Sequence, residues 1–181
     1  ENVPGLLSAC PGDKPVKERI FEAFDSIGYE IRNPQKLKDS IYCAEDFETP
    51  QKRNRIIIIG VNKQSDYVLE DLYQSVTNYK SNSPHKTVRD AIGDLPVLLP
   101  LETPIKEGRS TISHRQQGGA PIDKHYSRYH GDRDQKLFKT WLIRNMNMCS
   151  QEEKMEYYTE VTGHTSNHIK YRNLEWDKPS P

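Results

Sequence analysis

Four consecutive isoleucines, at residues 56–59, constrain the fold of this chain more than any other feature. They belong to a β-branched run, residues 55–61, that is apolar on both faces. A strand of this kind is typical of the buried part of an α/β sheet, where helices cover both faces. Apolar residues recur at helical spacing at residues 16–27, ending at Gly28, and again at residues 69–76. The first half therefore predicts an α/β fold.

The sequence changes character after residues 80–86, a polar stretch containing a proline that predicts a linker. Short strands and long loops are expected next, and a helix is expected to begin near Asp132. Ser150 with Glu153 forms a capping-box pattern for another helix. The residues at the end, 174–179, are predicted to be a strand or an extended segment. In the helix near Asp132 the residues expected to be buried are Leu137, Phe138, Trp141 and Leu142.

Charge is unevenly distributed along the chain. The formal net charge is zero, which by itself argues weakly against a nucleic-acid partner. Residues 104–145, however, carry nine Lys/Arg against four Asp/Glu, a local charge of +5. Phosphate binding requires a concentrated positive face rather than a basic average. The second half therefore keeps DNA as a candidate partner.

Three cysteines, Cys10, Cys43 and Cys149, lie far apart in the sequence. An odd number of widely spaced cysteines favours reduced thiols in an intracellular protein over a disulfide framework. No apolar run approaches the roughly 20 residues that a membrane-spanning helix needs. The expected location is the cytoplasm of a bacterium, with no membrane partner.

Histidine pairs raise the question of a metal site. They are His125 with His130, and His164 with His168. Neither pair has cysteine or carboxylate partners at the spacing of a known zinc site. We therefore expect no metal.

Two charged motifs carry a family resemblance. The chain begins with E-N-V at residues 1–3, followed by P-G-L, and Q-K-R-N-R stands at residues 51–55. These segments resemble the E-N-V and Q-x-R-x-R blocks of the DNA (cytosine-5) methyltransferases, in the same order. Residues 44–51, A-E-D-F-E-T-P-Q, are similar to the family's A-x-D-F-G-V-P-Q, with Glu48 where glycine is usual. Residues 87–96 look like the segment that follows the arginine block.

The resemblance implies a chemistry for two residues. Methylation at cytosine C5 needs a thiolate at C6, a proton donor at N3 and a cation near O2. By resemblance the carboxyl falls to Glu1 and the cation to Arg55. A guanidinium suits that place because it keeps its charge inside a pocket. The resemblance assigns the rest of the target-cytosine pocket to Asn2, Val3, Gln51 and Arg53.

By the same resemblance, residues 1–79 are the C-terminal part of a Rossmann-like catalytic domain. Residues 87–181 are then a small mixed α+β target-recognition domain that binds double-stranded DNA. Arginine reads guanine and glutamine reads adenine, while a glycine pair lets backbone approach a groove. A purely structural role for the aromatic and cationic residues near Arg128 remains open. The candidate DNA-binding residues are Arg115, Gln116, Gln117, Lys124 and Arg128.

The family's nucleophile is the cysteine of a P-C-Q block, and no cysteine of this chain stands in such a block. The family's S-adenosylmethionine loop and last cofactor block are also not found in this sequence. We therefore expect a C-terminal fragment that is inactive alone and contains no cofactor-binding residues. A missing N-terminal catalytic half, in the same chain or in a separate subunit, would be its partner. The alternatives are a non-catalytic DNA-binding module, a subunit of a split methyltransferase, and a relative that methylates tRNA cytosine.

Overall fold

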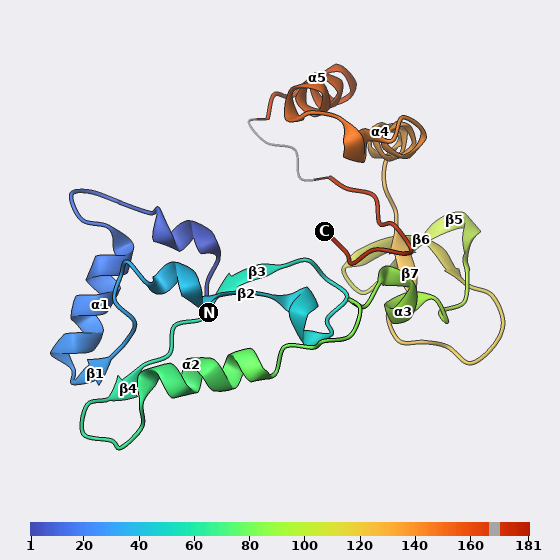
Figure 1. Ribbon diagram of the computed structural model, residues 1–181. Coiled ribbons are helices and arrows are strands. Elements are labelled where there is room, and N and C mark those ends of the chain that lie inside the picture. Colours follow the sequence, from blue (N-terminus) through green and yellow to red (C-terminus); the bar gives the residue numbers. More distant parts are fainter. Residues whose placement is uncertain (167–170) are drawn as a thin grey trace. The chain divides into compact units, whose positions relative to one another are not determined.

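The computed structural model describes residues 1–166 and 171–181. The chain divides into two compact units (Figure 1). Unit 1 comprises Glu1–Gly93 with Leu174–Pro181, and unit 2 comprises Asp94–Asn173. Both combine helices with small antiparallel sheets, which confirms the predicted α/β class. No helix in the described ranges is long and apolar enough to cross a membrane.

Unit 1 is built from short strands and three α-helices. The predicted helices at residues 16–27 and 69–76 are confirmed, and Gly28 ends the first with a φ of +82°. Glycine adopts this left-handed conformation without steric cost. The strands are β1 (Tyr29–Glu30), β2 (Ile41–Cys43), β3 (Asn54–Ile56) and β4 (Val61–Asn62). The helices are α1 (Val16–Ser26), α2 (Leu69–Asn78) and α3 (Val88–Ile92), with 3-10 helices at Pro4–Leu7, Leu37–Ser40 and Ala44–Phe47.

The prediction of one continuous strand at residues 55–61 is wrong. The run forms two short strands instead: β3 pairs antiparallel with β2, and β4 pairs with β1. Between them, the hydroxyl of Tyr73 accepts a hydrogen bond from the backbone N–H of Ile59 (2.9 Å) and donates one to the carbonyl of Ile57 (3.2 Å). A buried side chain of α2 thus satisfies backbone groups that a neighbouring strand would otherwise pair. The run is buried as predicted only at its ends, Ile56 and Val61.

Changing Tyr73 to phenylalanine tests this account of the broken strand. The variant keeps the ring but leaves two backbone groups of the run unpaired. We expect the free energy of unfolding to fall by about 1–3 kcal/mol, the cost of an unsatisfied buried polar group. Urea denaturation followed by circular dichroism measures the change. Tyr79→Phe is the matched control, because Tyr79 is 81% exposed and its loss of a hydroxyl should be nearly neutral. Equal stability of the two variants would contradict the account.

A second contact fixes α2 to the rest of unit 1. The guanidinium of Arg32 lies 3.5 Å from the centroid of the Tyr73 ring. It also donates to both carboxylate oxygens of Glu70, at 2.5 and 3.0 Å. This hydrogen-bonded pairing holds the pKa of Glu70 below its ordinary value. Stacking and pairing together orient the helix through its first two turns.

The turn containing Glu48 is kept although glycine is usual there in the family that the sequence resembles. Glu48 ends the 3-10 helix Ala44–Phe47 in the left-handed conformation, with a φ of +58°. That conformation costs a residue with a Cβ about 1–2 kcal/mol. The hydroxyl of Ser81 donates to the Glu48 carboxylate at 3.1 Å and offsets part of that cost.

The C-terminal segment Leu174–Pro181 packs within unit 1. The predicted extended segment at residues 174–179 contains a turn at residues 176–177 instead. Strand-like pairing is confined to Ser180, which forms a parallel bridge with Gln51. Helix α3 also holds this segment, because the N–H of Val88 donates to the carbonyl of Lys178 at 2.9 Å. Arg89 pairs with Asp177 at 2.8 Å and lies over the ring of Trp176.

Unit 2 begins with a three-stranded antiparallel sheet in the order β5–β6–β7. The strands are β5 (Leu98–Glu107), β6 (Ser110–Gln116) and β7 (Tyr126–Arg128). Gly108, with a φ of +57°, lies in the tight turn between β5 and β6. Residues 80–86, the predicted linker, form no helix or strand, whereas the compact unit begins only at Asp94. The assignment of residues 87–181 to target recognition stays a prediction.

Two helices form the separate apolar core of unit 2. They are α4 (Asp132–Ile143) and α5 (Gln151–Thr162), joined by a 3-10 helix at Met146–Met148. The capping box of Ser150 with Glu153 is confirmed at the start of α5. Leu142 was predicted to be buried but is 67% exposed, because it projects about 140° from Leu137 around the helix. The buried cluster consists of Leu137, Trp141, Met146 and Tyr157, with Phe138 packed against it.

Candidate functional site

Glu1 and Arg55 meet in unit 1. The Glu1 carboxylate lies 3.1 Å from Nε of Arg55, although the residues are more than 50 positions apart in the sequence. Backbone pairing brings them together, because Asn2 exchanges hydrogen bonds of 3.0 and 2.9 Å with Ile56. The first residues thus run antiparallel to β3, which carries Arg55. The carboxylate is 58% exposed and the guanidinium 21%, so solvent or a ligand can reach the pair.

The ion pair borders a hollow of about 290 Å³. Arg53 also lines this hollow, two residues before Arg55 on the same chain segment. A lining that combines apolar side chains with one carboxylate and two guanidiniums suits a flat, polar molecule, whose faces can contact apolar atoms while its edges meet charged groups. The apolar lining consists of Tyr42, Ala44, Phe47, Ile57 and Val76.

The other predicted pocket residues lie beside this hollow rather than in its lining. Asn2 accepts a hydrogen bond from the N–H of Val3 at 2.8 Å through its side chain, which fixes the backbone next to Glu1. Val3 is 50% exposed. Gln51 forms a parallel bridge with Ser180, three residues before β3 begins. These residues can support the hollow without contacting its contents.

Cys43 lines the same hollow, although sequence reasoning set it aside because it lacks the P-C-Q surroundings. Its thiol donates to the carboxylate of Glu45 at 3.3 Å. Its position opposite Asn54 in the β2–β3 pairing places it there. The position of Cys43 in the lining follows from the register of β2 and β3, which could not be read from the sequence.

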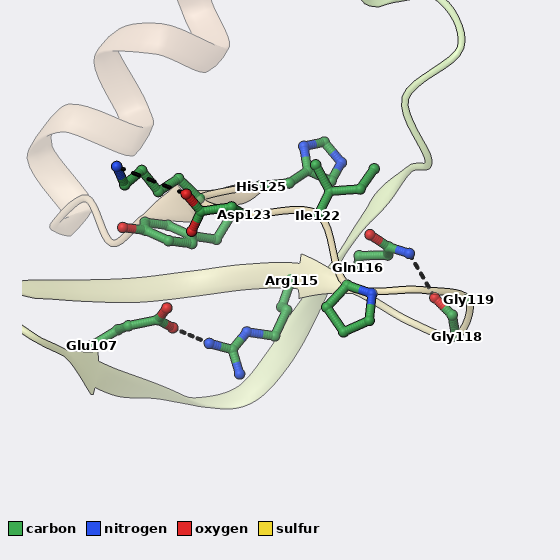
Figure 2. Close-up of a pocket in the computed structure, with 11 residues that line it drawn as sticks. Glu107, Arg115, Gln116, Gly118, Gly119, Ile122, Asp123 and His125 are labelled. Atoms are coloured by element: carbon green, nitrogen blue, oxygen red, sulfur yellow. Dashed lines mark hydrogen bonds and ion pairs between the residues drawn. The ribbon is translucent and has the colours of Figure 1, made fainter.

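A second hollow, of about 610 Å³, lies in unit 2 (Figure 2). Three predicted DNA-binding residues line it, namely Arg115, Gln116 and Lys124. Gln117 and Arg128 are exposed but are not part of its lining. The remaining lining includes Glu107, Gly118, Gly119, Asp123 and His125.

Gln116 holds one wall of this second hollow. Its amide Nε2 donates to the carbonyls of Gly118 (2.7 Å) and Ala120 (3.1 Å), as Figure 2 shows for Gly118. Gly118 and Gly119 both have positive φ values, +74° and +71°, and close the turn. The amide is engaged within its own loop, so the predicted contact of Gln116 with adenine stays a prediction.

The cations of this hollow differ in how they are paired. Arg115 forms an ion pair with Glu107, an acid that sequence reasoning did not single out. Lys124 is 81% exposed and lies 3.8 Å from Asp123, so its ammonium is nearly free in solvent. Lys124 also adopts a φ of +56°, which turns the chain toward β7. The hollow thus combines a guanidinium paired with Glu107 and a largely exposed ammonium.

Within residues 1–166 and 171–181, no group of three or more His, Cys, Asp or Glu side chains is arranged to hold a metal ion. His168, one member of the histidine pairs considered from sequence, lies outside the described residues. Nε2 of His125 donates a hydrogen bond to the carbonyl of Pro96 at 2.8 Å. His125 therefore has a structural contact in unit 2.

Comparison with known proteins gives a consistent match. A model of the family described as C-5 cytosine-specific DNA methylase matches residues 1–176. The chain is 39% identical over 104 residues to the Type II methyltransferase M.Bpa9945I of Bacillus paralicheniformis, covering 56% of this chain and 22% of that protein. It is 36% identical over 97 residues to M.BsuRI of Bacillus subtilis, covering 52% and 20%.

A third relative aligns along almost the whole chain. The Type II methyltransferase M.PspPI of Psychrobacter sp. is 26% identical over 191 residues, covering 99% of this chain and 36% of that protein. The matched regions thus span only about a fifth to a third of the relatives' lengths. No solved structure matches the chain.

Proposed function

The chain belongs to the C-5 cytosine-specific DNA methylase family, and from that premise we propose that it supplies half of a cytosine pocket together with a DNA-reading unit. The complete enzyme, meaning these 181 residues with the polypeptide that carries the nucleophile and cofactor site, transfers a methyl group from S-adenosylmethionine to C5 of cytosine. Like the relatives named as Type II methyltransferases, it would serve restriction-modification in the bacterial cytoplasm. Its substrate is double-stranded DNA.

The ion pair of Glu1 and Arg55 at the rim of the first hollow is the single observation that carries this proposal. A flipped cytosine presents N3 and O2 on one edge, and the two side chains are the acid and the cation that this edge requires. Glu1 donates or shares a proton with N3, and Arg55 offsets the negative charge that develops near O2. The apolar floor with Tyr42 and Phe47 offers a stacking surface for the extruded base.

The nucleophile and the cofactor site are not assigned to residues of this chain. S-adenosylmethionine supplies the methyl group when bound, and the family's P-C-Q cysteine supplies the thiolate that adds at C6. Cys43 lines the first hollow, but its thiol is hydrogen-bonded to Glu45 and no proline and glutamine flank it. We therefore propose that the 181 residues alone neither bind the cofactor nor transfer a methyl group.

Unit 2 is proposed to be the DNA reader. Its local charge of +5 over residues 104–145 matches the electrostatic requirement of a phosphate-binding face. Lys124 and Arg128 are exposed cations suited to phosphate contacts, which fix the register of a protein on the duplex. Arg115 is suited to contact a base edge. Side chains placed to contact base edges favour duplex DNA over a tRNA helix, because side chains cannot read the deep and narrow major groove of A-form RNA.

Titrating the isolated 181-residue chain tests this division of labour. Calorimetry with S-adenosylmethionine is expected to show no binding, and tritiated cofactor should leave no label on DNA. Sequence-selective duplex binding, measured by fluorescence anisotropy after selection from a randomised pool, is expected to persist. Cofactor binding by the isolated chain would contradict the proposal that the cofactor site lies elsewhere. Failure to bind any DNA sequence would contradict the proposed role of unit 2 in reading DNA.

Arg115→Ala then tests the reader itself. Loss of a base-contacting arginine should weaken binding to the selected site about 5- to 150-fold, the range expected for one bidentate base contact. Arg133→Ala is the matched control for the loss of one positive charge from the same stretch, because Arg133 lies on α4, pairs with Asp134 and is not in the lining of the second hollow; it should leave the selectivity unchanged. If both variants keep the parental affinity and selectivity, base reading belongs to other residues.

A further inference from the structure

The second hollow contains an ion pair with unused hydrogen-bonding groups on both partners. Arg115 comes from β6 and Glu107 from the end of β5, and the guanidinium points toward the carboxylate (Figure 2). The guanidinium is 44% exposed and the carboxylate 42%. A ligand entering the hollow can therefore touch both side chains at once.

The contact between the two side chains uses one nitrogen of the guanidinium and one oxygen of the carboxylate. It joins Nη2 of Arg115 to Oε2 of Glu107, and within the described parts of the chain neither side chain has another partner. The Nε and Nη1 donors of the guanidinium are thus available, and so is Oε1 of the carboxylate. A guanidinium has two edges that carry two donors, Nε with Nη2 and Nη1 with Nη2, and an ion pair through one N–H of Nη2 leaves one of these edges for another acceptor group. The pair presents two donors beside one acceptor.

This pattern complements one base pair. In the major groove guanine offers its acceptors O6 and N7, while the paired cytosine offers the donor N4–H. We propose that Arg115 and Glu107 together read a single G·C pair, with Arg115 on the guanine and Glu107 on the cytosine. The inference rests on the proposed role of unit 2 as a DNA reader and names the base pair that it selects.

The same pattern rejects an A·T pair. There the N6–H donor of adenine would face the guanidinium of Arg115, and the O4 acceptor of thymine would face the carboxylate of Glu107. Both encounters leave polar groups unpaired, and the second brings two negative oxygens together. The ion pair also fixes the guanidinium before binding, so less side-chain freedom is lost when the base pair is read.

The surroundings allow a base edge to approach. Gly118 has no Cβ, and open space lies where a Cβ would be. Gln116 donates a hydrogen bond to the carbonyl of Gly118 at 2.7 Å, which ties the glycine turn to the end of β6. Lys124 stands at the same hollow with its ammonium in solvent, where it can reach a phosphate. Base reading and backbone contact are thus available from one surface of unit 2.

Glu107→Gln separates base reading from ordinary surface pairing. Glutamine keeps the size of the side chain but adds a donor, so it can pair with thymine O4 as well as with cytosine N4–H. The full 181-residue chain and its variants are offered a pool of duplexes with a randomised core, and the selected sequences are read. Sites selected by the parental chain are expected to share one G·C pair. At that pair the preference for G·C over A·T should fall about 5- to 150-fold in Glu107→Gln.

Overall affinity gives a second readout. Removing a negative charge lessens repulsion from phosphates, so Glu107→Gln should bind the pool as tightly as the parental chain, or more tightly. Arg115→Lys keeps the charge but loses the planar fork, and it should lose guanine preference at the same pair. Glu102→Gln is the matched control on β5, exposed and not in the lining of the hollow, and should leave the selected sequence unchanged.

The outcomes distinguish the two levels of inference. If the parental chain selects a sequence and Glu107→Gln and Arg115→Lys select the same one, the ion pair is only a surface contact of the kind that contributes little. The G·C assignment is then overturned while DNA reading stands. If the parental chain selects no sequence at all, both the reader and the assignment fail. Thermal melting of each variant by circular dichroism identifies any that fails to fold, and the other variant then decides.

Discussion

Replacing Glu1 with glutamine is expected to slow methyl transfer by the complete enzyme about 100- to 10,000-fold, the range that a positioned proton donor contributes. The amide has the size of the carboxyl group but has no acidic proton to give to cytosine N3. DNA affinity should change little, because the residues proposed to read DNA lie in unit 2. Single-turnover kinetics with tritiated S-adenosylmethionine measures the rate, and anisotropy measures the affinity.

Two further variants sharpen this test. Glu30→Gln makes the same chemical change at an exposed position of β1 outside the hollow, and should leave the rate unchanged. Arg55→Lys keeps a cation but loses the fixed guanidinium, and should lower the rate about 100- to 1,000-fold, as loss of one stabilising donor does. A parental rate in Glu1→Gln would place the proton donor elsewhere and leave the Glu1–Arg55 contact as a structural pair.

Replacing Trp141 with alanine is expected to destabilise the helical part of unit 2 by about 3–5 kcal/mol, as removal of a large core aromatic does. Trp141 is 1% exposed and packs between α4 and α5, where its ring lies 6.3 Å from that of Tyr157. Hydrogen exchange of the α4 and α5 amides, followed by mass spectrometry, measures the local stability. These amides should lose protection while those of unit 1 keep theirs.

Leu142→Ala is the control for that experiment. It lies on the same helix, next to Trp141, but is 67% exposed, so its truncation should change protection by no more than about 0.5 kcal/mol. If the two variants lose equal protection, the core of unit 2 is not organised around Trp141. The sequence prediction grouped both residues with the buried face, although helical geometry places Leu142 about 140° from Leu137 around the helix.

Elements with a local cause were predictable from the sequence. The helical spacing of α2 and the capping box of Ser150 with Glu153 depend on residues a few positions apart, and both are found as predicted. The strand at residues 55–61 failed because its interruption depends on Tyr73, which lies in a later helix. At Glu48 a contact distant in sequence preserves a local structure instead: the turn was expected to need glycine, but it forms with a glutamate whose carboxylate accepts a hydrogen bond from Ser81.

The candidate sites divide in the same way. The family resemblance pointed to Glu1 and Arg55, and the pairing of Asn2 with Ile56 brings them together. Glu107 and Cys43 were missed because each enters a hollow through strand geometry, without a motif of its own. The strand pairing shifts its register within β5 and β6, and these shifts decide which side chains lie near Arg115. No pattern of residues in the sequence predicts such shifts.

The closing segment Leu174–Pro181 has a consequence for how the protein could be re-engineered. Unit 2 is an insertion in unit 1, and the bond of Val88 with Lys178 holds its two connections to unit 1 near one another. An inserted unit whose two ends lie close together can be exchanged for another unit, or for a short loop, because the connection costs little entropy and the rest of the fold is unchanged. Unit 2 could therefore be swapped as a cassette between relatives, with the Glu1–Arg55 pair left in place.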